Sequence, residues 1–572
     1  SFARSMQVKE KTAFFIPNTI TPMPDIYIPM GKLNGAKDKD KVIVQLTKWE
    51  KSTRKPEGEV IKIFTPEQEN DLAMQAIVAE AGFALNFSEE VNQFAKNLSE
   101  KIEANEIAKR KDYRNILTFT IDPVDAKDFD DAISFRNLPN GNTEIGVHIA
   151  DVSHFVQPNT AIDKEAYERA TSVYLPDRVY PMLPERISNE LCSLRPNEDK
   201  LTFSACFEID AKGKIVNTWY GKTIIHSVRR FTYEQVQEII ETQKGDHSNE
   251  ILWLLHFTQN VRKARFDNGA INFSSQEVRF VLDANGKPTG ITIKESKESH
   301  QLIEELMLLA NQLIAQKMGQ VKIKKETLPF PYRVHDQPNE EKLAPFIVFA
   351  KKHGYAFDIS TPLQTAHSFN DLMKAAQQSP ERHVLEQLGI RTMAKAVYTS
   401  DNIGHYGLGF EYYCHFTSPI RRYPDILVHR IVQSVLLEKP INDSELEQKC
   451  VHCSERERAA MEAERAANKY KQVEFMQNYI GQSFEGIISG VSSFGFWVET
   501  LEHKCEGLVS VVSLSEFDDF RLVESDYALV GMRSGRRFSM GEKVTIKVIA
   551  ANLEKRQLDY QWEIPKKPKS TT

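Results

Sequence analysis

Short apolar runs separated by turn residues occur at both ends of the chain. Residues 1–65 hold such runs at 13–16, 25–29 and 42–46, with Pro, Gly and Asn between them. Residues 479–563 show a similar alternation. Runs this short with regular breaks are typical of small all-β barrels. We therefore predict an OB-type barrel at each end of the chain.

The middle of the chain mixes strand-like and helix-like segments. Residues 66–113 predict a helical linker, and residues 114–478 predict one larger domain. Within that domain, a stretch rich in Glu, Ala, Lys and Arg predicts a long helix from Ser444 toward Tyr479. The predicted fold class is α+β: a mixed α/β central domain flanked by two OB barrels, with a short basic tail over residues 564–572.

One segment of the central domain concentrates five carboxylates, in Asp122-Pro-Val-Asp-Ala-Lys-Asp-Phe-Asp-Asp131. Apolar runs at 116–121 and 132–135 predict a strand on each side, so the carboxylates are expected on the connecting loop. Carboxylates this close repel one another, which raises some of their pKa values unless a cation neutralises them. A hard divalent ion such as Mg²⁺ or Mn²⁺, bound through oxygen, would remove this conflict.

The acidic segment has two other interpretations. A solvated acidic turn is the simpler alternative, and the carboxylates alone do not exclude it. A calcium-binding EF-hand loop is excluded, because Val124 and Ala126 stand at ligand positions and the required Gly is absent.

Composition limits the class of protein without choosing it. The net charge of −6 does not exclude a basic channel, and residues 1–65 hold 12 Lys or Arg against 7 Asp or Glu. No apolar run is long enough to span a membrane, so no membrane partner is expected. Six scattered cysteines predict reduced thiols and a cytoplasmic location. The chain shows no Walker-type phosphate loop, so we expect no use of ATP.

Three further motifs follow the acidic segment, in a fixed order. They are Gly146-Val-His-Ile-Ala-Asp-Val-Ser-His-Phe155, Thr171-Ser-Val-Tyr-Leu-Pro176 and His415-Phe-Thr-Ser-Pro-Ile-Arg-Arg-Tyr-Pro-Asp425. Together with the acidic segment they resemble the catalytic domain of the ribonuclease II and ribonuclease R family of 3′-to-5′ exoribonucleases. The resemblance covers nearly the whole chain, and the last motif is most similar to that of ribonuclease R. Such proteins usually have more N-terminal sequence, so we expect the first barrel domain to be truncated.

The resemblance implies hydrolysis at a site with two Mg²⁺ (or Mn²⁺) ions. The implied metal ligands are four of the five carboxylates: Asp122, Asp128, Asp130 and Asp131. Asp130 would hold or activate the attacking water through metal, and we expect it to be the least replaceable. Arg421 matches the arginine that would stabilise the scissile phosphate. For Arg422, an RNA contact and a salt bridge to Asp425 are equal alternatives.

The resemblance also implies residues that recognise the 3′ end of RNA. Tyr174 and Phe273 match the aromatic side chains that stack against the last base, although their residue types alone are more typical of a core. Glu305 matches a glutamate near the terminal ribose, and its neighbour Glu304 is an equal candidate. An acceptor near the 2′-hydroxyl would favour RNA over DNA.

Aromatic residues in the predicted barrels are further candidates for base stacking. The first barrel offers Phe14, Phe15 and Tyr27, two of which are expected to fill the core. The second offers Phe494, Phe496 and Trp497. We expect Phe494 and Phe496 to share one face of a strand and Trp497 to lie on the other, with at least one of the three in the core.

The resulting hypothesis is a processive exoribonuclease that releases nucleoside 5′-monophosphates. Its substrates would be single-stranded RNA, RNA with a 3′ overhang and structured RNA, and the chain is expected to be a monomer. The alternatives are a non-catalytic OB-fold RNA-binding protein or chaperone, and a nuclease that also degrades DNA. Unwinding of duplex RNA without help is left open.

Overall fold

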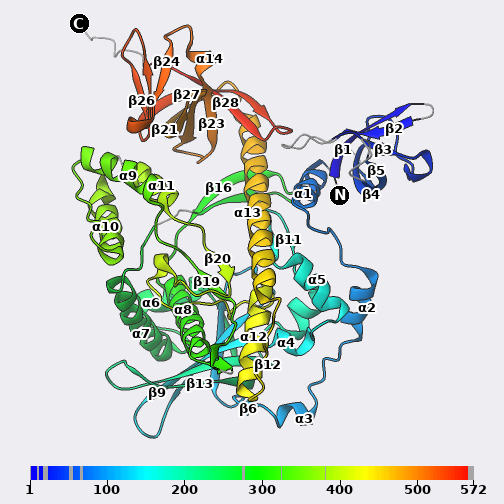
Figure 1. Ribbon diagram of the computed structural model, residues 1–572, viewed down its shortest axis with the longest axis vertical. Coiled ribbons are helices and arrows are strands. Elements are labelled where there is room, and N and C mark those ends of the chain that lie inside the picture. Colours follow the sequence, from blue (N-terminus) through cyan, green and yellow to red (C-terminus); the bar gives the residue numbers. More distant parts are fainter. Residues whose placement is uncertain are drawn as a thin grey trace.

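The computed structural model describes residues 2–9, 12–16, 24–49, 56–64, 69–273, 277–323, 325–379 and 382–564. Apart from residue 564, the predicted basic tail lies outside these ranges. Two barrels flank a larger central domain, and the long helix α13 (Leu446–Met476) runs from that domain to the C-terminal barrel (Figure 1). The predicted α+β architecture with flanking barrels is confirmed.

The N-terminal barrel is closed and has the strand order β1-β2-β3-β5-β4. Its strands are β1 (Phe2–Lys9), β2 (Thr12–Phe15), β3 (Ile26–Ile28), β4 (Lys41–Lys48) and β5 (Glu57–Phe64). Phe15 is fully buried, whereas Phe14 lies opposite Tyr27, with ring centroids 5.7 Å apart and both side chains half-buried. Only one of these three aromatic residues therefore fills the core, because Phe14 and Tyr27 share the outer face of paired strands.

Three helices connect the barrel to the central domain: α1 (Glu69–Glu80), α2 (Glu89–Asn97) and α3 (Ala104–Ile107). Polar contacts fix α1 to a hairpin of the central domain made by β10 (Val173–Tyr174) and β11 (Val179–Tyr180). The Asn70 amide donates to Asp177 at 2.9 Å, and Asp71 forms an ion pair with Arg178. The linker is therefore attached to the segment that contains Tyr174.

A seven-stranded sheet forms the base of the central domain, in the order β14-β7-β8-β9-β12-β13-β6. The strands are β6 (Lys111–Asp112), β7 (Leu117–Asp122), β8 (Asp131–Asn137), β9 (Thr143–Ala150), β12 (Asp199–Ile209), β13 (Ile215–His226) and β14 (Arg229–Thr232). β8 and β9 form a hairpin whose turn contains Asn140 and Gly141, and Gly141 has a φ of +84°. This left-handed backbone conformation suits glycine.

Helices pack around the sheet and form one large core with it. They are α4 (Val152–Phe155), α5 (Ala161–Arg169), the π-helix at Arg186–Leu191, α6 (Tyr233–Thr242), α7 (Ser248–Asp267), α8 (Glu298–Gly319), α12 (Tyr423–Leu436) and α13. The predicted helix from Ser444 to Tyr479 corresponds to α13. No helix in the described part of the chain is both long and apolar enough to cross a membrane.

A separate helical cluster lies at one side of the central domain (Figure 1). It is made of α9 (Glu340–Lys352), α10 (Pro362–Ala375) and α11 (Arg382–Thr392). The remaining small sheets pair β15 (Glu277–Leu282) with β16 (Pro288–Lys294), β17 (Lys322–Ile323) with β18 (Glu326–Thr327), and β19 (Tyr332–Val334) with β20 (Val397–Thr399).

The C-terminal barrel is also closed, in the order β21-β22-β23-β28-β27. Its strands are β21 (Ser483–Ser492), β22 (Gly495–Thr500), β23 (Glu506–Ser510), β27 (Lys543–Asn552) and β28 (Gln557–Trp562). Between β23 and β27 lie α14 (Val511–Leu514) and a small sheet of β24 (Phe520–Val523), β25 (Ala528–Gly531) and β26 (Arg537–Ser539).

One prediction for this barrel is wrong. Phe494 does not share a strand face with Phe496, because β22 begins one residue after Phe494. Phe496 is fully buried against Phe538, as expected for one of the three aromatics. Phe494 is 57% exposed and contacts Trp497 edge-on, with ring centroids 5.3 Å apart. Phe494 and Trp497 therefore form an outer aromatic pair, comparable to Phe14 and Tyr27 in the first barrel.

Candidate active site

The five carboxylates lie where two neighbouring strands of the central sheet are joined. β7 ends at Asp122 and β8 begins at Asp131, so the loop between them spans residues 123–130. Asp122 and Asp130 are buried, Asp128 and Asp131 are partly buried, and Asp125 is exposed. Asp125, which the resemblance left outside the ligand set, is thus also the most solvated of the five.

We call residues 122–131, the loop with the aspartates at its two ends, the carboxylate loop. Contacts from three other parts of the domain hold it in place. The Arg230 guanidinium donates to the carbonyl oxygens of residues 123 and 124 at 2.6 and 3.0 Å, and it lies over the Phe129 ring. The Ser193 hydroxyl accepts from the Phe129 amide and donates to the carbonyl of residue 127. The Ala150 amide donates to the Asp130 carbonyl at 2.9 Å. The loop is therefore fixed through its backbone, which leaves its carboxylates available.

Burial raises the pKa values of the carboxylates in this loop. Burial, with a contribution from Asp128, raises the pKa of Asp122 to about 6. Burial and the neighbouring Asp122 raise the pKa of Asp131 to about 8. Burial also raises the pKa of Asp128, and it raises that of Asp130 well above its usual range despite the nearby Arg421. Four acids that resist ionisation together form a site that lacks positive charge.

The motif His415–Asp425 places an arginine against these carboxylates. The Ile420 amide donates to Asp130 Oδ1 at 3.1 Å, and Arg421 Nε lies 3.7 Å from Asp130 Oδ2. The Arg421 side chain is 42% exposed and also donates to the Ser418 hydroxyl at 3.1 Å. Asp130 is thus oriented by a backbone amide, while Arg421 keeps an exposed face for an anion.

Tyr174 approaches the same site from the β10–β11 hairpin. The Ser172 amide donates to the Arg421 carbonyl at 3.1 Å, which joins this hairpin to the motif His415–Asp425. The Tyr174 amide donates to the Glu464 carboxylate of α13 at 3.2 Å. Burial, with contributions from Asp128 and Asp130, raises the pKa of Tyr174 to about 12. The structure therefore brings Tyr174, Arg421 and the carboxylate loop together.

Arg422 and Glu305 are engaged in buried salt bridges. Arg422 pairs with Asp425 at 2.8 Å, which is the salt bridge considered as one alternative for this residue. Glu305 is 1% exposed and accepts from Arg262 and Arg265 at 2.7 and 2.5 Å. Glu304 is about half exposed. Of the two glutamates, Glu304 is therefore the more accessible.

Phe273 packs against the helical cluster. Its ring contacts Phe369 of α10, with centroids 5.7 Å apart. Among the ring contacts of the described residues, none joins Phe273 to Tyr174. The paired aromatic clamp predicted from these two residues therefore stays a prediction.

Several residues beside the site were missed in the sequence. Tyr233 begins α6, and burial together with the charges of Asp131 and Asp122 raises its pKa. Glu464 accepts from the Tyr174 amide, and Arg230 donates to the backbone of the carboxylate loop. A Thr232–Gln235 capping box marks the start of α6 in the sequence. The sequence around Arg230, Tyr233 and Glu464 does not indicate that they meet a loop about 100 to 340 positions earlier in the chain.

The residues present fit a hard divalent cation. In the described part of the chain, no three His, Cys, Asp or Glu side chains already surround one ion position. However, the loop offers only carboxylate oxygens, and Asp122 Oδ2 is buried without a hydrogen-bond partner. Mg²⁺ and Mn²⁺ prefer such ligands and would supply the missing charge.

Comparisons with known proteins show the family of this chain. The family model of the RNB domain matches residues 110–438, and that of the cold shock domain matches residues 14–88. The chain is thus an RNB-domain protein with a cold-shock domain before the RNB domain. Ribonuclease R of Thermotoga maritima is 35% identical over 563 residues, which cover 96% of this chain and 78% of that protein. The chain belongs to the ribonuclease R family.

Two further relatives define the extent of the similarity. Ribonuclease R 1 of Lactococcus lactis is 38% identical over 521 residues, which cover 88% of this chain but only 62% of that protein. The RNase R of Mycoplasma genitalium, solved in complex with ribose methylated single-stranded RNA, has the same fold with a TM-score of 0.87. It is 24% identical, and the match covers 98% of this chain and 89% of that one.

Proposed function

We propose that this protein is a processive, hydrolytic 3′-to-5′ exoribonuclease that releases nucleoside 5′-monophosphates. The observation that carries the proposal is the set of buried, mutually repelling carboxylates with Arg421 beside it, in a chain of the ribonuclease R family. A solvated acidic turn would be exposed and would show no such pKa shifts.

The proposed catalytic chemistry depends on two divalent ions, Mg²⁺ or Mn²⁺. Asp122, Asp128 and Asp131 are the proposed ligands, and Asp130 would ligate and also orient the attacking water. When bound, such ions polarise a phosphate and lower the pKa of water. Asp130 Oδ1 accepts from the Ile420 amide, which leaves Oδ2 and the second lone pair of Oδ1 for a cation or water.

Arg421 would neutralise the scissile phosphate. Its guanidinium has parallel donors that match two phosphate oxygens, and its exposed face allows this contact. Its neighbour Asp130 keeps the guanidinium beside the carboxylate loop. Stabilising charge that develops on the phosphate lowers the barrier of the chemical step.

Tyr174 would stack against the last base and set the position of cleavage, with Phe273 as its proposed partner. Stacking on an aromatic ring does not depend on the base, which suits an enzyme that shortens any sequence. Glu304 or Glu305 would accept from the terminal 2′-hydroxyl and favour RNA. Of these, the exposure of Glu304 supports its assignment.

The barrels are proposed to collect single-stranded RNA, including 3′ overhangs, through Phe14, Phe494 and Trp497. Phe496 and Arg422 would then support their neighbours, since Phe496 is fully buried and Arg422 pairs with Asp425. We propose a cold-shock-type domain over residues 1–65, a linker over 66–113, a catalytic domain over 114–478 and an OB domain over 479–563. The protein is proposed to act as a monomer and without ATP. Its six cysteines are buried and free, which supports a reducing, cytoplasmic setting.

A degradation assay tests the proposed activity. Single-stranded RNA labelled at its 5′ end, and DNA of the same sequence, are incubated with the full chain in Mg²⁺ or in chelator. The expected result is stepwise shortening of RNA in Mg²⁺ only, with nucleoside 5′-monophosphates as the product. RNA binding without shortening in Mg²⁺ or Mn²⁺ would favour the non-catalytic alternative. Equal shortening of DNA would overturn the preference for RNA.

A further inference from the structure

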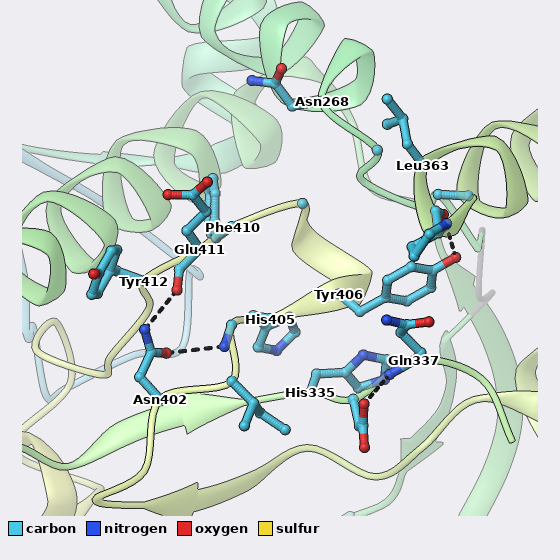
Figure 2. A pocket seen from close by; sticks show the side chains of 17 residues that line it. Asn268, His335, Gln337, Leu363, Asn402, His405, Tyr406, Phe410, Glu411 and Tyr412 are labelled. Atoms are coloured by element: carbon cyan, nitrogen blue, oxygen red, sulfur yellow. Dashed lines mark hydrogen bonds between the residues drawn. The ribbon is translucent and has the colours of Figure 1, made fainter.

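A cavity of about 560 Å³ lies away from the carboxylate loop, between the central domain and the helical cluster. It is bordered by the end of α7 at Asn268, the start of α10 at Leu363, the segment after β19 and residues 402–412. Figure 2 shows Asn268 and Leu363 on one side of this cavity and three aromatic rings on the other. No residue proposed for hydrolysis lines it.

The aromatic wall consists of His335, His405 and Tyr406. The two histidine rings are 5.1 Å apart and inclined by 19°, and the Tyr406 ring is inclined to His335 by only 12° at 6.5 Å. The Gly407 amide donates to His335 Nδ1, and the Tyr406 hydroxyl donates to the carbonyl of residue 362. These contacts fix the rings in a nearly parallel row (Figure 2).

Polar groups without partners stand around this aromatic wall. The side chains of Asn268, Gln337 and Glu411 line the cavity, belong to solvent-exposed residues and form no hydrogen bond or ion pair with other described residues, so they are open to a ligand. His405 Nδ1 is buried and also lacks a partner. Unmet polar atoms on a buried ring are uncommon in native proteins.

The charge of the cavity excludes a phosphate as its main ligand. None of the described lining residues is Lys or Arg, and two of them, Asp336 and Glu411, are acidic. Burial lowers the pKa of His405 to about 3 and also lowers that of His335, so both rings are neutral at pH 7. The cavity therefore suits a flat, neutral ligand with hydrogen-bond donors.

The cavity is joined to the proposed binding site for the RNA end. The Ile271 amide, two residues before Phe273, donates to the Gly407 carbonyl at 3.0 Å. His405 also contacts Tyr413 edge-on, and Tyr413 contacts His415, the first residue of the motif that contains Arg421. A ligand in this cavity would thus lie beside the RNA path and apart from the catalytic carboxylates.

We propose that this cavity binds an unstacked nucleobase that carries an amino group. The base would stack on a ring at an end of this row, His405 or Tyr406, because aromatic side chains hold unstacked bases by their faces. Glu411 would accept from the exocyclic amino group of adenine or cytosine, and Asn268 or Gln337 would complete the base edge. Uracil has no exocyclic amino group and is expected to bind more weakly.

Binding of free nucleosides tests the proposal without hydrolysis. Adenosine, cytidine and uridine are titrated into the full-length Tyr174→Ala variant in chelator, so that the proposed terminal-base stack is removed and no RNA is degraded. We expect saturable binding of adenosine and cytidine, and weaker binding of uridine. Glu411→Gln should lower the affinity for cytidine about tenfold, because a hydrogen bond to a charged acceptor is lost.

Controls separate this cavity from general effects. Asp401→Asn removes an exposed carboxylate from the same loop outside the cavity and should leave nucleoside binding unchanged. Tyr406→Ala should weaken adenosine and cytidine alike. Thermal unfolding establishes that each variant is folded. Absence of saturable binding, or binding that neither Glu411→Gln nor Tyr406→Ala weakens, would overturn the proposal.

RNA-binding measurements distinguish a base of the bound strand from a released product as the ligand of the cavity. The affinity for a single-stranded oligonucleotide rich in cytosine is measured in chelator for the otherwise unaltered chain and for Glu411→Gln. A weaker RNA complex of Glu411→Gln assigns the cavity to a base of the bound strand. Unchanged RNA affinity with weakened cytidine binding assigns it to a released product. Because neither measurement uses hydrolysis, failure here leaves the proposed nuclease activity intact.

Discussion

Asp151 and the carboxylate loop lie side by side on the central sheet. The protein supplies enough positive charge to balance Asp151 but not enough to balance the loop. Asp151, directly after β9, is fully buried and contacts Lys222 at 2.5 Å and Arg110 at 2.8 Å. Burial alone would raise its pKa, but the two cations hold the pKa of Asp151 well below its usual range. The carboxylate loop is joined to this region by the hydrogen bond from the Ala150 amide to the Asp130 carbonyl. Its four buried or partly buried acids have two arginines nearby, Arg421 beside Asp130 and Arg230, whose own hydrogen bonds go to backbone carbonyls.

This difference separates structural from functional burial of charge. At Asp151, protein cations complete the site, so the cluster needs no ligand and stabilises the fold around the loop. At the carboxylate loop, the pKa values rise because the protein does not supply enough positive charge. Strongly shifted pKa values with no protein partner are typical of functional sites. The predictions below test whether the two sets differ in this way.

The largest effect is expected for Asp130→Asn. This substitution should lower the rate of RNA shortening on the order of 10³-fold or more, because it removes a charge used only in the reaction. Its thermal unfolding temperature should stay the same or rise, since a buried and poorly compensated charge is lost. Initial rates and calorimetric melting check both parts. A variant that loses activity only because it unfolds would contradict the assignment.

Asp151→Asn should have the reverse effect, on stability. Removing this charge takes away the one carboxylate that Lys222 and Arg110 share, and the expected loss is about 3–5 kcal/mol in the free energy of unfolding. Denaturant unfolding of the full chain measures it. In the double variant Asp151→Asn, Lys222→Met, the loss should be smaller than the sum of the single losses. A loss below about 1 kcal/mol would show that the cluster is not structural.

Arg230→Met should weaken the carboxylate loop without removing a ligand. Because Arg230 holds the backbone at residues 123 and 124, its loss should raise the Mg²⁺ concentration for half-maximal activity about 10–100-fold. Activity at saturating Mg²⁺ should fall much less, and Arg230→Lys should restore part of the effect. Arg229→Met, on the same strand but paired with Asp246, is the matched control. Equal effects of Arg229→Met and Arg230→Met would contradict this role.

A smaller effect is expected from pH. Asp131 and Asp122, with pKa values of about 8 and 6, hold protons that a cation must displace. The Mg²⁺ concentration for half-maximal activity should therefore fall as pH rises from about 6 to about 8, by up to about tenfold per pH unit for each displaced proton. Activity titrations with Mg²⁺ at several pH values measure this, and a constant half-saturating concentration would contradict it.

Local patterns predicted much of this molecule. The apolar runs at 116–121 and 132–135 correspond to β7 and β8, the Asn140-Gly141 turn forms a hairpin, and the Glu/Ala-rich stretch forms α13. These features depend on residues close together in the sequence, where periodicity and turn residues are informative. The family and the fold class were predicted correctly for the same reason: their motifs are contiguous.

Contacts between distant segments could not be predicted in this way. Arg230 reaches a loop 107 residues earlier, and the Glu464 carboxylate lies 290 residues from Tyr174. The outer pairs of Phe14 with Tyr27 and of Phe494 with Trp497 depend on strand register and on where β22 begins, which the alternation left open. Similarly, Asp151 differs from Asp130 only through the cations that the fold brings to it.

The most direct measurement is a calorimetric titration of the full chain with Mg²⁺ at pH 7, in two buffers of different ionisation enthalpy. The account predicts saturable binding with release of protons, because Asp131 is largely protonated at that pH. It also predicts that Asp131→Asn abolishes the proton release. Absence of saturable binding, or binding without proton release in the unaltered chain, would contradict the view of the carboxylate loop as a cation site.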